Sequence, residues 1–277
     1  MPLLRRLVPL LLVAVACGAA PVHAQTLSLA YHRGDSFQYS YHSTSKQTII
    51  AGGVTLPTEI EVTAAEAVTV KSVDSSGNAD LTLVLSNVKI TSRGTSDVAN
   101  MTSGIEDLTT SLTVAADGHI VSQDGQQVAA GNAFLTAAGA GGTFFVTAVL
   151  PSSAVKPGDT WSKDYTQTSL TNGAIKITTH SKYLRNESLK GVNAAVVETT
   201  SNGSIDFSTG GGGGLSIKGT MTANVTAWID LANRRVLKSH SAQSNDGTMD
   251  VGSSAGLGGI TGPLTIKGTG TTDLTPV

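Results

Sequence analysis

Histidine can bind metals and transfer protons near neutral pH, but its spacing in this sequence supports neither role. Zinc sites place their ligands in short patterns such as His-x-x-x-His, His-Glu-x-x-His or paired cysteines, because the ligands must converge on one ion. No histidine stands in such a pattern; those beyond residue 24 are His32, His42, His119, His180 and His240. We therefore predict no metal-binding residues.

Nucleophiles and phosphate loops are equally unsupported. Serine is abundant, but none lies in a Gly-x-Ser-x-Gly elbow with triad partners after it. The glycine run at 210–214 lacks the Gly-Lys-Ser/Thr ending of a phosphate loop and is typical of a linker. Acidic residues show no calcium-loop spacing. We predict no catalytic residues, no cofactor and no enzymatic activity.

The composition excludes further classes of protein. Charged residues make up 14% and aromatic residues 4% of the 277 residues, whereas average chains carry about 25% charge. Coiled coils, charged disordered tails and nucleic-acid modules need dense charge, and platforms that stack bases need aromatic rings. We therefore expect no nucleic-acid partner. The polar surface must come from Ser, Thr, Asn and Gly.

Residues 1–24 have the pattern of a secretory signal peptide. A short start with two arginines precedes the apolar run Leu7–Ala20, and Val22 and Ala24 fit the positions that signal peptidase reads. The run is short for a bilayer span, so we predict an exported protein, periplasmic or extracellular, with no transmembrane segment in the mature chain. The alternative is a lipoprotein anchored at Cys17, since the residues before it loosely match a lipoprotein cleavage site.

Cleavage after Ala24 would change the charge and remove the only cysteine. Of the 18 basic residues, 16 would remain against 20 acidic ones, a formal net charge of −4. Such a chain has no reason to bind phosphate or anionic lipid head groups. Because no disulfide could form, a packed core must stabilise the fold.

Alternation of apolar and polar residues predicts strands over most of the chain. It is clearest from Leu215 to Leu231, where apolar or small residues take the odd positions. A sheet with one buried and one wet face requires this period. Short turn signals between strands favour antiparallel pairing. The other predicted strands are Phe37–Thr44, Glu59–Val73, Ala79–Ile90, Leu108–Val114, Ile175–Tyr183, Ala194–Thr200, Val236–Ser241 and Leu264–Thr271.

The segment Gln126–Ala138 differs, since its apolar residues are spaced like one face of a helix. The predicted fold class is therefore mainly β, with antiparallel curved sheets in two duplicated halves and one short helix between them. The predicted organisation is a signal peptide at 1–24, a first β half at 25–125, a helical connector at 126–150 and a second β half at 151–277.

Two similar motifs suggest the duplication. Gly34-Asp35-Ser36-Phe37 and Gly158-Asp159-Thr160-Trp161 each open a predicted strand. In both, glycine can take a positive φ, and the aspartate can accept hydrogen bonds from nearby backbone N–H groups before an aromatic residue enters the core. We therefore expect an internal repeat built on this turn.

These residues also carry a family resemblance. Together with the signal peptide and the mid-chain Leu150-Pro151, the motif Val155-Lys-Pro-Gly-Asp-Thr-Trp161 resembles an uncharacterised family of secreted bacterial β-proteins. That resemblance implies an envelope or extracellular location and no known activity. The curved-sheet pattern is also similar, in architecture alone, to LolA-like lipoprotein-carrier folds.

Small residues at the apolar, alternate positions of the strand Leu215–Leu231 predict a groove. Gly219, Ala223 and Ala227 cannot fill a wide interior as Leu and Phe would, so the sheet must either pack closely or leave a cavity. We predict a non-catalytic binding or carrier protein for an apolar, lipid-like ligand. The alternative is a structural or protein-interaction component of the bacterial envelope with no small-molecule ligand. A hydrolase assembled only in space is the third reading. The predicted ligand-binding residues are Leu215, Ile217, Met221, Val225 and Ile229.

Overall fold

The computed structural model describes residues 23–94, 108–125, 147–169, 173–208, 215–251 and 262–277. Within them, long alternating segments form strands. Their bounds are β1 Ser36–Ala51, β2 Val54–Val73, β3 Ala79–Gly94, β4 Leu108–Val114, β5 Ile120–Gly125, β6 Thr160–Ser169, β7 Gly173–Leu189, β8 Val192–Ser208, β9 Leu215–Asp230, β10 Val236–Val251 and β11 Gly262–Pro276.

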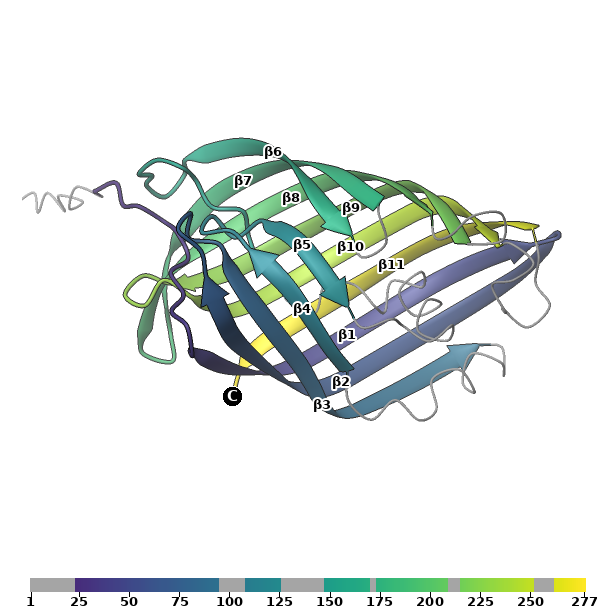
Figure 1. Ribbon diagram of the computed structural model, residues 1–277, viewed down its shortest axis with the longest axis horizontal. Coiled ribbons are helices and arrows are strands. Elements are labelled where there is room, and N and C mark those ends of the chain that lie inside the picture. The colour runs from purple at the N-terminus through teal and green to yellow at the C-terminus, as the bar shows by residue number, and fades with distance from the viewer. Residues whose placement is uncertain (1–22, 95–107, 126–146, 170–172, 209–214, 252–261) are drawn as a thin grey trace, which may run out of the picture.

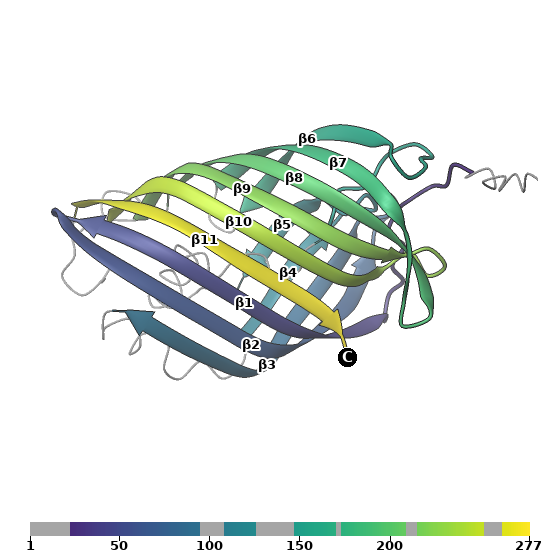
Figure 2. The same ribbon diagram turned by 180° about the vertical axis from the view of Figure 1, so that it is seen from behind.

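The strands join into a single sheet that closes on itself as a barrel (Figures 1 and 2). The order around the barrel is β1-β11-β10-β9-β8-β7-β6-β5-β4-β3-β2. Every neighbouring pair is antiparallel except β5 and β6, which run parallel. The prediction of a mainly β, antiparallel, curved fold is confirmed in this form: one closed sheet, with no helix among the described residues.

The predicted helix Gln126–Ala138 lies outside the described residues, as do residues 1–22 of the predicted signal peptide. The predicted domain boundaries therefore stay predictions, although β1–β5 fall within residues 25–125 and β6–β11 within 151–277. In the part of the chain that the structure covers, no helix has the length and apolar character needed to cross a membrane.

The two predicted strand-opening turns have the same hydrogen bonds. Asp35 Oδ2 accepts the N–H of His32 at 2.8 Å, and Asp159 Oδ2 accepts the N–H of Lys156 at 2.9 Å. Gly34 and Gly158 have φ values of 92° and 99°, which favour glycine. Whether the duplication extends to the whole halves stays a prediction.

Alternation decides which side chains face the barrel interior. On β1 the odd positions from Tyr39 to Ile49 are buried, whereas even positions such as His42, Thr44 and Lys46 are exposed or half-buried. The outer face of this strand is therefore polar and suited to contact with water. The same period holds on β2, where Thr58, Ile60, Val62, Glu66, Val68 and Val70 are buried.

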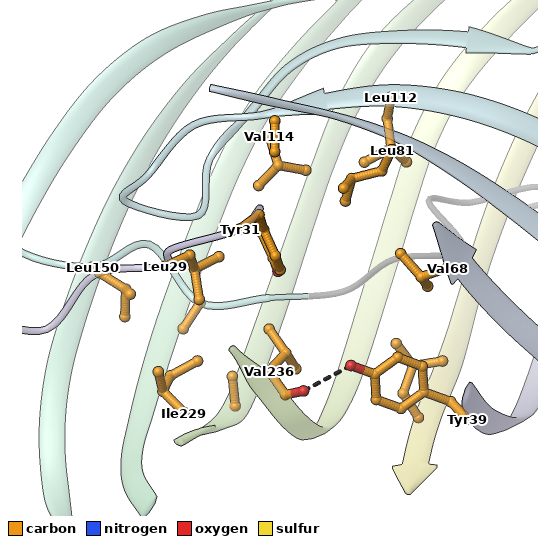
Figure 3. Packing of buried hydrophobic residues seen from close by; sticks show 14 of the residues in the cluster. Leu29, Tyr31, Tyr39, Val68, Leu81, Leu112, Val114, Leu150, Ile229 and Val236 are labelled. Carbon is orange, nitrogen blue, oxygen red and sulfur yellow. Dashed lines mark hydrogen bonds between the residues drawn. The ribbon is translucent and has the colours of Figure 1, made fainter. Parts of the chain in front are cut away.

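An apolar core fills one end of the barrel. Leu29 and Tyr31, from the segment before β1, and Leu150, from the segment before β6, pack inside the ring against strand residues such as Leu81 and Ile229 (Figure 3). Leu81 is 0% exposed. Because these segments cover the inner faces of distant strands, the core closes this end of the barrel without a helix among the described residues.

Trp161 belongs to the edge of this core, and its loss should lower stability. It is half-buried against the core, and its Nε1 donates a hydrogen bond to the Val149 carbonyl at 2.9 Å. Trp161→Ala is expected to reduce the free energy of unfolding by about 3 kcal/mol. Asp159→Ala and Asp35→Ala should each cost about 1 kcal/mol, through the lost turn hydrogen bonds. Urea titration measures all three, and an Asp159→Ala protein as stable as wild type would contradict the turn assignment.

Candidate functional site

Beyond the apolar core, the barrel interior is lined by buried polar side chains, which we call the polar belt. One cross-strand row runs Ser43, Thr272, Ser241, Val225, Thr199 and Ser181, from β1 through β11, β10, β9 and β8 to β7. Ser45, Gln47, Thr58 and Thr179 belong to neighbouring positions on the same inner face, and each is at most 4% exposed. The polar members of the row are at most 7% exposed.

Part of the polar belt satisfies itself. Ser181 Oγ lies 2.8 Å from Thr199 Oγ1, which also accepts the Val149 N–H at 3.1 Å. Gln47 Nε2 donates to Ser45 Oγ at 3.2 Å. The Gln47 side chain lies over Gly268, where a Cβ would meet Gln47 Oε1 at 2.0 Å, so a larger residue at this position would displace the end of the Gln47 side chain.

Other inward-facing oxygens have no partner. Gln47 Oε1, Thr58 Oγ1, Ser239 Oγ and both carboxyl oxygens of Glu66 are buried and make no hydrogen bond. Most buried polar atoms in folded proteins are paired with protein groups or with ordered water. These atoms lie on β2, on its neighbour β1 and on β10, which β11 separates from β1, so they line one side of the interior. They mark where the interior can accept hydrogen bonds from a guest molecule.

Glu66 is the most unusual of these residues. It is 1% exposed, and in the sheet it lies opposite Tyr39 on β1 and Leu85 on β3. Burial in this apolar setting raises the pKa of Glu66 to about 8, because the charged form loses its hydration. Tyr39 is engaged elsewhere, since its hydroxyl donates to the Val236 carbonyl at 2.7 Å (Figure 3). At neutral pH the Glu66 carboxyl is therefore mainly protonated.

The sequence contains a signal for Glu66 that is not part of any catalytic motif. Glu66 stands on the apolar parity of its strand, among Ile60, Val62, Val68 and Val70, where an acid breaks the pattern. Burying an acidic side chain at an inward-facing strand position costs free energy unless the carboxyl group is paired or neutral. Only the closed barrel, which covers the inner face, reveals that it stays unpaired.

The barrel wall is weakest where β5 meets β6, a contact that we call the seam. The paired register there consists of Ser122 opposite Thr168 alone. A polar cluster on the same side strengthens the seam: Lys163 Nζ donates to Asp117 Oδ2, and His119 Nδ1 lies 2.5 Å from Asp117 Oδ1. The His119 ring also packs on Tyr165, with ring centroids 4.8 Å apart.

Asp117 is the centre of the seam cluster. Its burial acts to raise its pKa, but hydrogen bonds from His119 and Lys163 outweigh that effect and lower the pKa to about 2. Asp117 is therefore an ionised carboxylate over the ordinary pH range and holds the cation of Lys163. Because Asp117 belongs to the β4–β5 hairpin and Lys163 to β6, their ion pair bridges the seam.

The predicted ligand-binding residues of β9 are distributed along the barrel axis. Ile229 is 1% exposed and packs in the apolar core, whereas Val225, 7% exposed, lies in the polar-belt row. Met221 is half-buried and faces inward beside Gly203, where a Cβ would meet Met221 Cγ at 2.9 Å. The side chains of Leu215 and Ile217 lie outside the described residues. Whether this set binds a ligand stays a prediction.

A groove of about 790 Å³ crosses the outer face of the barrel over β3, β2, β1, β11, β10 and β9. Its walls combine outward-facing residues with Gln47, Thr58 and Asn245 of the inward-facing positions, and two ion pairs lie within it. Lys267 Nζ is 2.9 Å from Asp246 Oδ2, and Lys46 Nζ is 3.6 Å from Glu59 Oε1. The groove therefore reaches the polar belt at Gln47 and Thr58.

The described histidines are dispersed over the fold. His42 Nε2 lies 2.9 Å from Glu61 Oε1, and His240 Nδ1 lies 2.8 Å from Asp273 Oδ1, both pairs on the outer face. Among the residues whose positions are given, no group of three His, Cys, Asp or Glu side chains is arranged to hold a metal ion.

Solved structures with a distant likeness to this chain include an outer membrane channel and a DUF1329 family protein. The crystal structure of the COG4313 outer membrane channel from Pseudomonas putida F1 is similar with a TM-score of 0.28 and 8% identity, over 89% of this chain and 97% of that one. A DUF1329 family protein from Desulfovibrio piger is similar with a TM-score of 0.13 and 9% identity, over 85% and 83%. No protein-family model and no curated protein matches the chain. At these TM-scores neither likeness bears on the site or its chemistry.

Proposed function

We propose that this protein is an exported, non-catalytic binding or carrier protein of the bacterial envelope. Its barrel interior takes an amphiphilic ligand with an apolar chain. The sequence predicts a lipid-like ligand, and the polar side chains of the interior indicate that this ligand also has a polar end. The observation that carries the proposal is the set of inward-facing oxygens without partners on Gln47, Thr58, Ser239 and Glu66. Such groups are costly in an empty interior, and a guest with hydrogen-bonding groups would satisfy them.

The distribution of polarity supports an interior guest. The polar belt adjoins the apolar core, so a molecule extending from one to the other would need both kinds of surface. Binding sites for small molecules are usually of this type: mostly apolar, with a few placed polar groups. The polar outer face of β1, by contrast, offers an apolar chain little to bind.

The seam gives the ligand a route into the closed barrel. Only Ser122 and Thr168 pair there, whereas β1 pairs with β11 from Tyr39 to Ala51. Separation of β5 from β6 therefore breaks fewer backbone hydrogen bonds than separation of β1 from β11. We expect the ligand to exchange between these two strands.

Met221→Trp tests interior binding directly. The larger side chain would occupy interior space beside Gly203, so uptake of an environment-sensitive apolar dye should fall at least about tenfold while the fold survives. Dye fluorescence measures uptake and circular dichroism measures folding. Thr222→Trp is the matched control, because residue 222 faces the outer groove. Equal dye binding by both variants would argue against an interior site.

A structural or interaction role in the envelope is the second candidate, and the outer groove is the observation that favours it. Native mass spectrometry of protein purified from its own host separates the two. A co-purifying amphiphile of fixed mass supports the carrier proposal. A stoichiometric protein partner with no small molecule supports the interaction role.

A further inference from the structure

Glu66 lies in the wall of the barrel with its carboxyl buried and unused. At 1% exposure, both Oε1 and Oε2 lack a hydrogen-bond partner. Its cross-strand neighbours are Tyr39 and Leu85, so the carboxyl lies between an aromatic and an aliphatic side chain. Buried carboxyl groups are almost always hydrogen-bonded to protein groups or ordered water, so this one is open to a bound molecule that supplies the missing partners.

The nearby polar groups are engaged elsewhere. Tyr39 donates to the Val236 carbonyl, and the Tyr41 hydroxyl interacts with Ser43 and Thr272. Arg235, whose charge acts on Tyr39, pairs with Asp230 at 3.7 Å and lies over the Phe37 ring at 5.4 Å. Glu66 therefore has no charged partner among the described residues. A buried carboxyl in this setting offers one O–H donor and one C=O acceptor side by side.

The position of Glu66 also suits the end of an apolar chain. Val68 and Val70, which follow it on the same inner face of β2, belong to the apolar core at 0% and 1% exposure. Val62 and Ile60, on the other side along β2, also belong to the apolar core, and Thr58 of the polar belt lies beyond them. Glu66 is thus a polar position within the apolar part of the interior, with apolar side chains on both sides along its strand.

We propose that Glu66 is the head-group subsite of the barrel, and that it takes an uncharged head group carrying one donor and one acceptor, a carboxylic acid or a primary amide, on an apolar chain. Either group forms two hydrogen bonds with a protonated carboxyl. An alkylammonium would bring a charge into the buried interior and would require Glu66 to ionise, which burial opposes. This inference rests on the proposed function.

Binding of chain-matched probes to the full-length protein tests the subsite. Hexadecanamide, hexadecanoic acid and hexadecylamine are each titrated against a bound fluorescent dye. Wild type should bind the amide at least tenfold more tightly than the amine, and the acid should bind more tightly at pH 5 than at pH 8. Glu66→Leu should lose about tenfold or more in amide affinity, because the amide would lose both hydrogen bonds.

Two matched variants control the test. Glu66→Gln keeps a neutral donor and acceptor and should retain amide affinity within about threefold. Glu61→Leu removes an acid from the same strand on the outer face, where it pairs with His42, and should leave all affinities unchanged.

Failure of the inference and failure of the proposed function give different results. If wild type binds none of the probes, the carrier proposal itself is wrong. If the probes bind but Glu66→Leu keeps full amide affinity, or the amine binds as tightly as the amide, the subsite is wrong, and Glu66 holds buried water only. If Glu66→Leu does not fold, the amide-to-amine ratio of wild type and of Glu66→Gln decides.

Discussion

Wild-type protein is expected to lose about 3 kcal/mol more stability than Glu66→Gln when the pH is raised from 5 to 8. Burial raises the pKa of Glu66 from its ordinary 4.5 to about 8, so the folded state holds a proton that the unfolded state releases. The stabilisation from Glu66 is complete below the unfolded pKa and is lost as pH rises through the folded pKa. Each unit of pKa difference corresponds to about 1.4 kcal/mol of stability, and most of the loss of the Glu66 contribution falls between pH 5 and 8.

Thermal and urea unfolding at pH 5, 6, 7 and 8 measure the difference. Glutamine cannot ionise, so Glu66→Gln should show only the pH dependence of the groups that both proteins share. Asp117, whose pKa lies at about 2, loses its contribution only as pH falls below the ordinary range of aspartate, outside this window. Parallel curves for the two proteins would mean that Glu66 is paired or hydrated in solution.

Closing the seam with a disulfide is expected to slow exchange of an interior ligand at least tenfold. Ser122 and Thr168 are sheet partners across the seam, so cysteines at both positions can form a bridge with little backbone movement. The only native cysteine is Cys17, within the predicted signal peptide, so the exported chain would carry no competing thiol. Stopped-flow dye release under oxidising and reducing conditions measures the rate, and a reductant should restore it.

A second cysteine pair distinguishes the seam from general stiffening. Thr44 and Thr271 are partners on β1 and β11, with hydroxyl oxygens 2.8 Å apart on the outer face. Their disulfide should leave the exchange rate unchanged. Asp117→Asn should speed exchange, because it removes the charge that holds Lys163 across the seam. Equal slowing by both disulfides would show that the ligand does not pass between β5 and β6.

The sequence by itself determined the local structure well. Alternation from Leu215 to Leu231 predicted a strand, and β9 covers Leu215–Asp230. The Gly-Asp turns were also predictable, because the positive φ of Gly34 and Gly158 and the Asp hydrogen bonds depend on residues within a few positions. Strand period and turn chemistry are short-range properties, so a single sequence carries them.

Tertiary structure alone decided the closure of the sheet and the content of its interior. Alternation tells which residues share a face, but not that β1 returns to pair with β11 or that β5 runs parallel to β6. Serines at the inward-facing positions of β1 look like surface residues in the sequence, and only closure buries Ser43 and Ser45 to 3% and 2% exposure. Glu66 follows the same rule, since its unpaired state depends on distant strands that exclude water. Burial is a property of the whole barrel, and the local pattern cannot contain it.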